Sequence, residues 1–592
     1  MLYPIQNDAR NRFDLSGLWD FRSDPEEVGE RDGWFNWLPD ARPMAVPGSW
    51  NEQYEDIFNY LGLAWYVKRI YVPRHWPGER VFIRVGSANY YGTIYVNGTK
   101  VGSHEGGHLP FAFEITELVR RNEENVIAIS VENHLKPTRV PSGNIPSALG
   151  AFASFPRTSF DFFPFAGLHR PVVLYTVPQS YIEDVTVVTG IDGTDGTVKV
   201  RATVNGAAET GHVILTDGDQ TVAADLSFEE GAAQTSFSVP DARFWSNKDP
   251  HLYDLTIQTV SDRYTLQVGI RTVEVQGGQI LLNSQPVQMN GFGRHEDFFA
   301  SGKGLNLPLL VKDYGLMRWT GATSYRTSHY PYSEEEMQLA DREGFLIIDE
   351  IPAVSLQFEN DENVAERLRM CLKQLDELVA RDKNHASVVM WCVANEPQPS
   401  GLDLEAVGGK NEDPSVARGR EFLETLLRHA RELDPTRPVT LVGVMGGPSD
   451  WMHECDVICI NRYWGWYVNG GELDKGLATL EQELDAYWEM FNKPIVMTEF
   501  GADTIAGMHG HPAVMWTEEY QADYVRGHLE VAARKDFVAG MHVWNFADFV
   551  AVQSVMRVGG MNMKGVFTRT RQPKMVAHIL REFWAKGADT AP

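Results

Sequence analysis

The chain has 592 residues, a formal net charge of −27 and 43% hydrophobic residues. This length exceeds one ordinary hydrophobic core and predicts about two to four globular domains. The strong negative charge excludes a nucleic-acid-binding protein, because an acidic surface repels phosphate backbones. An anionic small ligand would need local cations to overcome the same field.

The N-terminal residues Met1 to Arg10 lack the apolar segment of a signal peptide, and no later apolar run reaches membrane-spanning length. We therefore expect a cytoplasmic protein without membrane contact. The chain has four cysteines, Cys371, Cys392, Cys455 and Cys459, and three of them lie in or beside apolar strand-like runs. We expect them to be small buried residues rather than a disulfide framework or a metal site.

Two β-rich regions come first in the chain. Residues 1–180 contain short alternating segments such as Val81–Val85 and Gly92–Val96, separated by Gly, Pro and Asn. This pattern predicts an antiparallel β-sandwich of the jelly-roll kind. Further strands in residues 181–274, including Thr197–Val204 and Tyr253–Ile257, fit an immunoglobulin-like β-sandwich.

Strand-like and helix-length segments alternate in residues 275–592. The helix candidates include Glu334–Arg342 and Ala365–Ala380. The strand candidates are Val287–Gly291, Ser324–Thr327, Phe345–Asp349, Ser387–Val393, Pro438–Val442, Val457–Ile460, Pro494–Met497 and Gly540–Trp544. Eight strands with helices between them predict a C-terminal (β/α)8 TIM barrel.

Two glutamates follow strands of this predicted barrel. Glu396 comes after the fourth strand and Glu499 after the seventh, about three βα units further on. Barrels of this kind keep their chemistry at the carboxyl ends of the strands, and two facing carboxylates are the groups that cleave a glycosidic bond. This chemistry requires no cofactor. We assign no metal site, since nearby acids such as Glu296, Asp349 and Glu350 lack convincing ligand spacing.

The residues around both glutamates resemble glycoside hydrolase family 2. The matching motifs are Asn395-Glu396-Pro397 and Thr498-Glu499-Phe500-Gly501, and the resemblance extends over essentially the whole chain, because that family has the same domain order. It implies that Glu396 is the acid/base and Glu499 the nucleophile of a retaining exo-glycosidase, with Asn395 holding the sugar 2-hydroxyl. Retention requires a covalent glycosyl-enzyme intermediate.

A glycine-rich loop after the eighth strand indicates the sugar. Asn562-x-Lys564 resembles the motif by which β-glucuronidases of this family bind the sugar carboxylate. The resemblance further implies that Tyr463 hydrogen-bonds the nucleophile and that Tyr467 and Arg557 help to fix the carboxylate. It therefore implies a β-D-glucuronide as the substrate.

Three further sugar contacts follow from the same resemblance. Trp544 is expected to line the sugar pocket, and Asp161 is expected to reach from the first domain to the sugar hydroxyls. Two histidines follow early barrel strands, His295 and His329. We expect His329 to contact the sugar, whereas either residue could instead be a core or supporting histidine.

The sequence departs from the family pattern at three places. Met561 stands between Gly560 and Asn562, which weakens the assignment of Arg557, and Trp464 replaces a frequent Tyr. The segment Ile351–Asn363 leads directly into a helix and leaves no room for a long loop over the aglycone. We therefore expect an open entrance that admits bulky aglycones.

Several alternatives share these features. A β-galactosidase, β-mannosidase or β-galacturonidase would carry the same two glutamates, and only the galacturonidase would also need a cation such as Lys564. A non-catalytic carbohydrate-binding protein would not need both glutamates, Asn395 and Tyr463. Relatives of the family are often homotetramers, so the resemblance also implies self-association.

Overall fold

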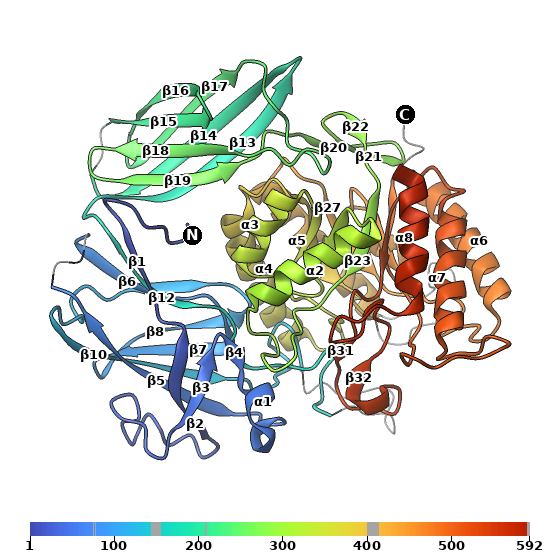
Figure 1. Ribbon diagram of the computed structural model, residues 1–592, viewed down its shortest axis with the longest axis horizontal. Coiled ribbons are helices and arrows are strands. Elements are labelled where there is room, and N and C mark those ends of the chain that lie inside the picture. The colour runs from blue at the N-terminus through green and yellow to red at the C-terminus, as the bar shows by residue number, and fades with distance from the viewer. Residues whose placement is uncertain (75, 77, 144–154, 208–209, 400–413, 589–592) are drawn as a thin grey trace.

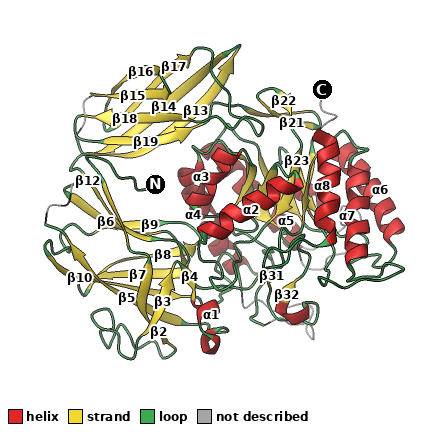
Figure 2. Ribbon diagram, viewed as in Figure 1, coloured by secondary structure: helices red, strands yellow, loops and turns green. Residues whose placement is uncertain are grey.

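The computed structural model describes residues 1–74, 76, 78–143, 155–207, 210–399 and 414–588. They form two β-sandwiches and a closed barrel (Figure 1). The predicted jelly-roll, immunoglobulin-like and barrel order is confirmed. In Figure 2 the strands fill the two sandwiches, whereas the long helices surround the barrel.

The first sandwich contains two antiparallel sheets. One has the strand order β1-β12-β6-β9, and the other has the order β3-β2-β5-β10-β7-β11-β4, with β8 paired to β7. Its elements are β1 (Asn11–Asp14), β2 (Gly17–Asp24), β3 (Arg42–Val46), β4 (Gly48–Ser49), α1 (Trp50–Gln53), η1 (Glu55–Ile57), β5 (Leu63–Val72), β6 (Arg80–Val85), β7 (Ala88–Val96), β8 (Thr99–Gly107), β9 (Phe111–Glu114), β10 (Glu123–Glu132), β11 (Gly167–Leu168) and β12 (Val172–Val177).

The second sandwich packs a three-stranded sheet, β13-β14-β17, against a four-stranded sheet, β16-β15-β18-β19. Its strands are β13 (Tyr181–Asp192), β14 (Asp195–Asn205), β15 (Thr210–Asp217), β16 (Gln220–Ser227), β17 (Ala232–Val239), β18 (Tyr253–Thr259) and β19 (Arg263–Val268). Alternate residues of β14, from Val198 to Val204, are buried in the core between the sheets. This period of two is the sequence signal of a strand with one face in a core.

The third domain is a closed barrel of eight parallel strands, preceded by a small sheet of β20 (Val273–Gln276), β21 (Gln279–Leu282) and β22 (Gln285–Pro286). The barrel strands are β23 (Met289–Gly293), β24 (Ser324–Arg326), β25 (Leu346–Glu350), β26 (Val388–Asn395), β27 (Val439–Gly443), β28 (Ile458–Asn461), β29 (Ile495–Phe500) and β30 (Val538–Val543). A short ribbon of β31 (Phe549–Val550) and β32 (Met561–Asn562) follows the last strand, with η4 (Val558–Gly560) just before β32.

Helices cover the outside of the barrel: α2 (Leu307–Thr320), α3 (Glu334–Glu343), α4 (Asp361–Asp382), α5 (Pro414–Leu433), α6 (Leu473–Phe491), α7 (Glu518–Ala532) and α8 (Met575–Ala588). The alternation departs from expectation once, because the 3₁₀ turn η3 (Ser449–Met452) joins β27 to β28. None of the described helices is long and apolar enough to cross a membrane.

Helix α3 illustrates how local sequence sets an element. The Ser333 side chain accepts a hydrogen bond from the backbone of Glu336 at the start of the helix, and three acidic residues occupy the first turn. Both features stabilise a helix N-terminus, where unpaired N–H groups carry positive partial charge. The helix ends at Gly344, whose φ of 73° favours glycine.

All four cysteines are buried and free. This agrees with the expectation that they act as small core residues. Within the described residues, no group of His, Cys, Asp or Glu is arranged to hold a metal ion.

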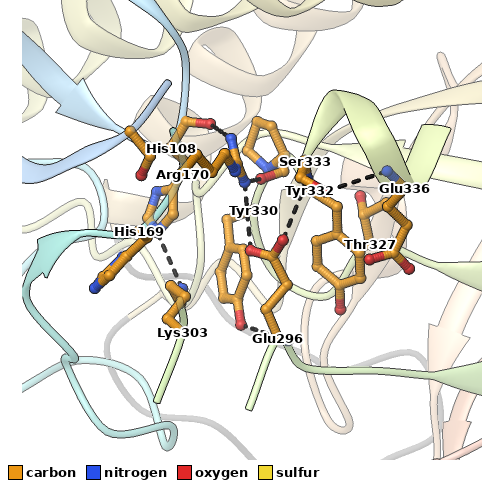
Figure 3. A network of polar contacts seen from close by, with 12 residues as sticks. His108, His169, Arg170, Glu296, Lys303, Thr327, Tyr330, Tyr332, Ser333 and Glu336 are labelled. Atoms are coloured by element: carbon orange, nitrogen blue, oxygen red, sulfur yellow. Dashed lines mark hydrogen bonds and ion pairs between the residues drawn. The ribbon is translucent and has the colours of Figure 1, made fainter. Parts of the chain in front are cut away.

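Arg170 ties the first sandwich to the barrel (Figure 3). Its guanidinium donates to the backbone oxygen of His108 in its own domain and to that of Pro331, at 2.6 Å, in the barrel. It also contacts Glu296 at 3.3 Å, and Glu296 accepts from the backbone of Ser333. These buried contacts fix the first sandwich against the segment that follows β24.

Candidate active site

Glu396 directly follows β26, the fourth barrel strand. Its φ of 47° lies in the left-handed region, which is uncommon for a residue other than glycine. The Asn461 amide, at the end of β28, donates to Glu396 Oε1 at 3.0 Å and to Asn395 Oδ1 at 3.1 Å. Two barrel strands thus hold this carboxyl group at the carboxyl end of the barrel.

Glu499 lies within β29, the seventh strand, rather than after it as the sequence suggested. The side chain is buried. Tyr463 donates its hydroxyl to Glu499 Oε2 at 2.6 Å, and the guanidinium of Arg326 donates to Oε1. His329 Nε2 lies 3.6 Å from the same oxygen.

The two glutamates share an electrostatic environment. Burial raises the pKa of Glu499 to about 8 despite the opposing charge of Arg326, and negative Glu396 adds to the increase. Burial also raises the pKa of Glu396. Because two negative charges in one buried site repel each other, the pair retains one proton near neutral pH.

Arg326 connects Glu499 to further polar groups. It donates to Glu350 Oε2 at 2.7 Å and to Asn395 Oδ1 at 3.3 Å. Glu350 also lies 2.9 Å from His329 Nδ1. Glu350 is therefore a buried ion-pair partner that fixes two side chains beside the nucleophile candidate.

Trp544 and His329 form an aromatic wall of the site. Their rings stack, with centroids 5.1 Å apart and an interplanar angle of 19°. Burial lowers the pKa of His329 to about 4, so its ring is neutral at physiological pH. His295 packs edge-on against Trp544 and bonds the hydroxyl of Tyr330, which makes it a supporting residue of this wall.

Lys564 is fully buried and has defined partners. Its ammonium group forms an ion pair with Asp503 and donates to the hydroxyl of Tyr467 at 2.9 Å. It also lies 5.7 Å from the centroid of the Tyr463 ring. Since Tyr463 bonds Glu499, one tyrosine separates this cation from the nucleophile candidate.

Asp161 reaches this cluster from the first sandwich. Arg557 donates to both carboxylate oxygens, at 2.7 and 2.9 Å, and Asn562 donates to Oδ2 at 2.8 Å. Burial opposes ionisation of Asp161, but the charge of Arg557 overcomes it and lowers the pKa. Arg557 also contacts Tyr467 at 3.2 Å.

The aromatic neighbours of Asp161 explain how a residue of another domain is held there. Phe160 and Phe162 are buried and belong to the same hydrophobic core as the barrel. The Phe162 ring lies 6.2 Å from that of His329. In addition, the backbone N–H of Val552 donates to the backbone oxygen of Asp161 at 2.9 Å. The first sandwich is thus part of the site.

The structure therefore brings every residue singled out from the sequence to one end of the barrel. Three members of the site were not singled out, namely Arg326, Asn461 and Asp503, and Glu350 was named only as an acid without a metal role. Arg326, Glu350 and Asn461 end barrel strands, and this position is itself a signal of function. Asp503 follows β29 by three residues, and no sequence pattern pairs it with Lys564.

Comparisons with known proteins identify the family. The sequence matches the family 2 glycosyl hydrolase sugar binding domain over residues 13–178, the family 2 domain over 180–271 and the family 2 TIM barrel domain over 273–588. It is 41% identical to a β-glucuronidase from Canis lupus familiaris, over 100% of this chain and 93% of the relative. It is 40% identical to a β-glucuronidase from Paenibacillus borealis, over 99% of both chains.

Solved structures agree with this assignment. A β-glucuronidase from an uncultured Clostridium species superposes with a TM-score of 0.90 at 38% identity, covering 99% of this chain and 100% of that chain. The Ruminococcus gnavus β-glucuronidase in complex with D-glucuronic acid gives a TM-score of 0.89 at 37% identity, covering 98% and 99%. The chain therefore belongs to glycoside hydrolase family 2 and is a glycoside hydrolase.

Proposed function

We propose that this enzyme is a retaining, exo-acting β-D-glucuronidase that releases glucuronic acid and an alcohol or phenol. The observation that carries this proposal is the position of Lys564. A buried cation lies one tyrosine away from Glu499, at a site where a neutral sugar would present only a hydroxymethyl group. The names of the relatives and the glucuronic acid bound by the Ruminococcus gnavus enzyme support the same substrate.

Glu499 is the proposed nucleophile and Glu396 the acid/base. Arg326 and Tyr463 donate to Glu499 and stabilise its carboxylate form, whereas the side-chain donor to Glu396 is the neutral amide of Asn461. When Glu396 holds the shared proton, its repulsion of Glu499 disappears. The pair then has one acid and one anion, as cleavage requires.

The reaction proceeds in two displacements. Glu499 attacks the anomeric carbon while Glu396 gives its proton to the leaving oxygen, so the glycosidic bond breaks and a glycosyl ester forms. Glu396, now ionised, takes a proton from water. The resulting hydroxide-like oxygen attacks the anomeric carbon, releases Glu499 and restores the original configuration.

Recognition of the sugar is divided between the two domains. Lys564, Asn562 and Arg557 are the proposed donors to the sugar carboxylate, with Tyr467 beside them. Asn395 is the proposed contact of the 2-hydroxyl, and His329, Trp544 and Asp161 complete the pocket. A charge-assisted hydrogen bond contributes about 1.5–3 kcal/mol, which favours an acid over a neutral sugar by roughly tenfold or more.

A panel of aryl glycosides tests the proposal. The parent should cleave the glucuronide fastest, and Lys564→Ala should lose most of this activity while any trace of galactosidase activity is spared. Equal losses of activity on both glycosides would show that Lys564 supports the fold instead of binding the sugar carboxylate. Proton NMR of the first-formed sugar should show the β-anomer, and an α-anomer would refute retention.

A β-galacturonidase is the remaining alternative with a use for Lys564. The galacturonide that such an enzyme cleaves differs from a glucuronide only in the configuration at C4. The aryl galacturonide therefore belongs in the same panel. Faster cleavage of the galacturonide than of the glucuronide would replace the proposed substrate. The shared catalytic pair would be unaffected.

Assembly is also a proposal. The family resemblance supports a homotetramer. Light scattering during size-exclusion chromatography would measure the number of subunits directly. A monomer at micromolar concentration would contradict the tetramer without affecting the proposed chemistry.

A further inference from the structure

A cavity lies between the immunoglobulin-like sandwich and the barrel. It has a volume of about 280 Å³ and is lined by β13, by the segment after β19, by the turn after α4 and by residues 435–437 before β27. The turn after α4 precedes barrel strand β26 and residues 435–437 precede β27, so the cavity lies at the opposite end of the barrel from Glu396 and Glu499. It is distinct from the active site.

Basic side chains dominate the charge of this cavity. Arg271, Lys383, His385 and Arg437 line it, whereas Glu274 is the one carboxylate among its lining residues. This is unusual in a chain with a net charge of −27. A concave surface with one sign of charge concentrates ligands of the opposite sign.

Three of these cations have carboxylate partners. Lys383 pairs with Asp184, His385 with Asp341, and Arg437 with Asp434 at 2.6 Å. Within each pair, the two opposite charges neutralise each other. Arg271 is the one cation of the lining that forms no ion pair with a described carboxylate.

Arg271 is buried, with 6% of its surface exposed, and forms no ion pair with any described carboxylate. Its Nε and Nη2 donate to the backbone oxygens of Ala386 and Val388, at 3.0 and 2.7 Å. Burial, together with the like charge of Arg437, lowers the pKa of Arg271 to about 9, although the negative charges of Asp434 and Asp341 oppose this decrease. The site thus destabilises the cation that it contains, and a bound anion would reverse this.

We propose that this cavity binds a small oxyanion of the phosphate class, with Arg271 as its principal partner. The two carbonyl contacts hold the guanidinium plane in place, and the remaining Nη1 is available to an anion in the cavity. A water molecule occupies about 30 Å³ of liquid volume, so the cavity accommodates a phosphate group with several waters or with a small ester substituent. Because Arg271 contacts the backbone at the start of β26, binding stabilises the junction of the two domains.

Calorimetric titration of the parent enzyme with sodium phosphate at constant ionic strength tests the proposal. We expect saturable binding of one phosphate per chain and a concentration-dependent rise of the melting temperature. Arg271→Gln should raise the Kd by about tenfold or more, because it removes a charge-assisted partner. Arg243→Gln, at an exposed arginine of the same domain, is the matched control and should leave the Kd unchanged.

Two other variants keep the test valid if Arg271→Gln does not fold. Glu274→Gln removes the one acid of the lining and should lower the Kd by about twofold, as expected for an exposed charge. Lys564→Ala removes the cation proposed to bind the sugar carboxylate in the active site and should leave phosphate binding intact. Loss of phosphate binding in Lys564→Ala would place the anion in the active site and overturn the proposal.

The source of the phosphate group is tested by a second ligand. Methyl phosphate that binds more tightly than inorganic phosphate would assign the cavity to phosphate esters, and the reverse order would assign it to the free ion. The absence of saturable binding to the parent, or an unchanged Kd in Arg271→Gln, would overturn the site. None of these results depends on which glycoside the enzyme cleaves.

Discussion

Lys564 and Asp503 form a buried ion pair beside the proposed nucleophile. Asp503 Oδ2 accepts from the ammonium of Lys564, and its Oδ1 accepts from the backbone of Met563 at 2.9 Å. The carboxylate therefore binds both the cation and the loop that carries it. This pairing stabilises a charge that would otherwise be buried alone, and it sets where the ammonium points.

Asp503→Asn should slow glucuronide cleavage because it disturbs the binding of the sugar carboxylate by Lys564. The asparagine oxygen can keep the bond to Met563, but its amide then faces the Lys564 ammonium with a second donor. We expect kcat/KM for an aryl glucuronide to fall by about tenfold or more, mainly through KM, since a charge-assisted hydrogen bond is lost. Steady-state kinetics on the glucuronide and on a neutral aryl glycoside measure the effect.

Asp523→Asn, on the exposed face of α7, is the control for this variant. It should match the parent on both substrates. If Asp503→Asn reduced the activity on the neutral glycoside equally, its role would be structural rather than one of sugar recognition.

The shared proton of Glu396 and Glu499 predicts a bell-shaped pH profile. Activity requires one proton on the pair, so kcat/KM should fall as pH rises through about 8 and the last proton is lost. It should also fall at low pH, where Glu499 becomes protonated. Initial rates between about pH 4 and pH 10 on an aryl glucuronide measure both limbs.

Glu396→Gln separates the two roles. With a poor leaving group, it should lower kcat/KM by about 10²–10⁴-fold, because the proton donor is lost. With an activated aryl leaving group, the alkaline limb should disappear. The acidic limb should stay at nearly the same pH, since Glu396 is protonated and neutral on that limb in the parent as well. An alkaline limb that stayed at the same pH would rule out Glu396 as the acid.

Asp161 and Arg557 should prove energetically coupled across the domain interface. Asp161→Asn keeps the size of the side chain but breaks the bidentate ion pair, and Arg557→Gln removes the other partner. We expect each variant to lower kcat/KM by about tenfold or more and the double variant to add little further loss. Fully additive losses would show that the two residues act independently.

An apolar aglycone should be accepted even when it is large. The segment Ile351–Asn360 is short and is tied to the end of β26 by bridges from Val354 to Asn395 and from Gln357 to Gln398. Residues 400–413 lie outside the described part of the chain. We expect a steroid glucuronide and a small aryl glucuronide to have kcat/KM values within about tenfold of each other. Rejection of the steroid conjugate would contradict the open entrance.

The sequence by itself determined the architecture and located the proposed catalytic pair. Alternation of period two marks the sandwiches, and eight apolar strands mark the barrel, because these patterns follow from which faces must be buried. Glu396 and Glu499 could be located since they stand at the carboxyl ends of strands that are recognisable one at a time. Asn562 and Lys564 could be located from a short local motif.

The tertiary structure decided which groups set the charge of the site. Asp503 lies 61 residues before Lys564, and Asp161 lies 396 residues before Arg557. No local pattern connects such pairs, because they meet only when the barrel closes and the first sandwich packs against it. From the sequence, Arg326 is likewise only a residue of a strand. The closed barrel places it between Glu350 and Glu499. Ionisation and orientation depend on distance in space, so only the folded chain determines them.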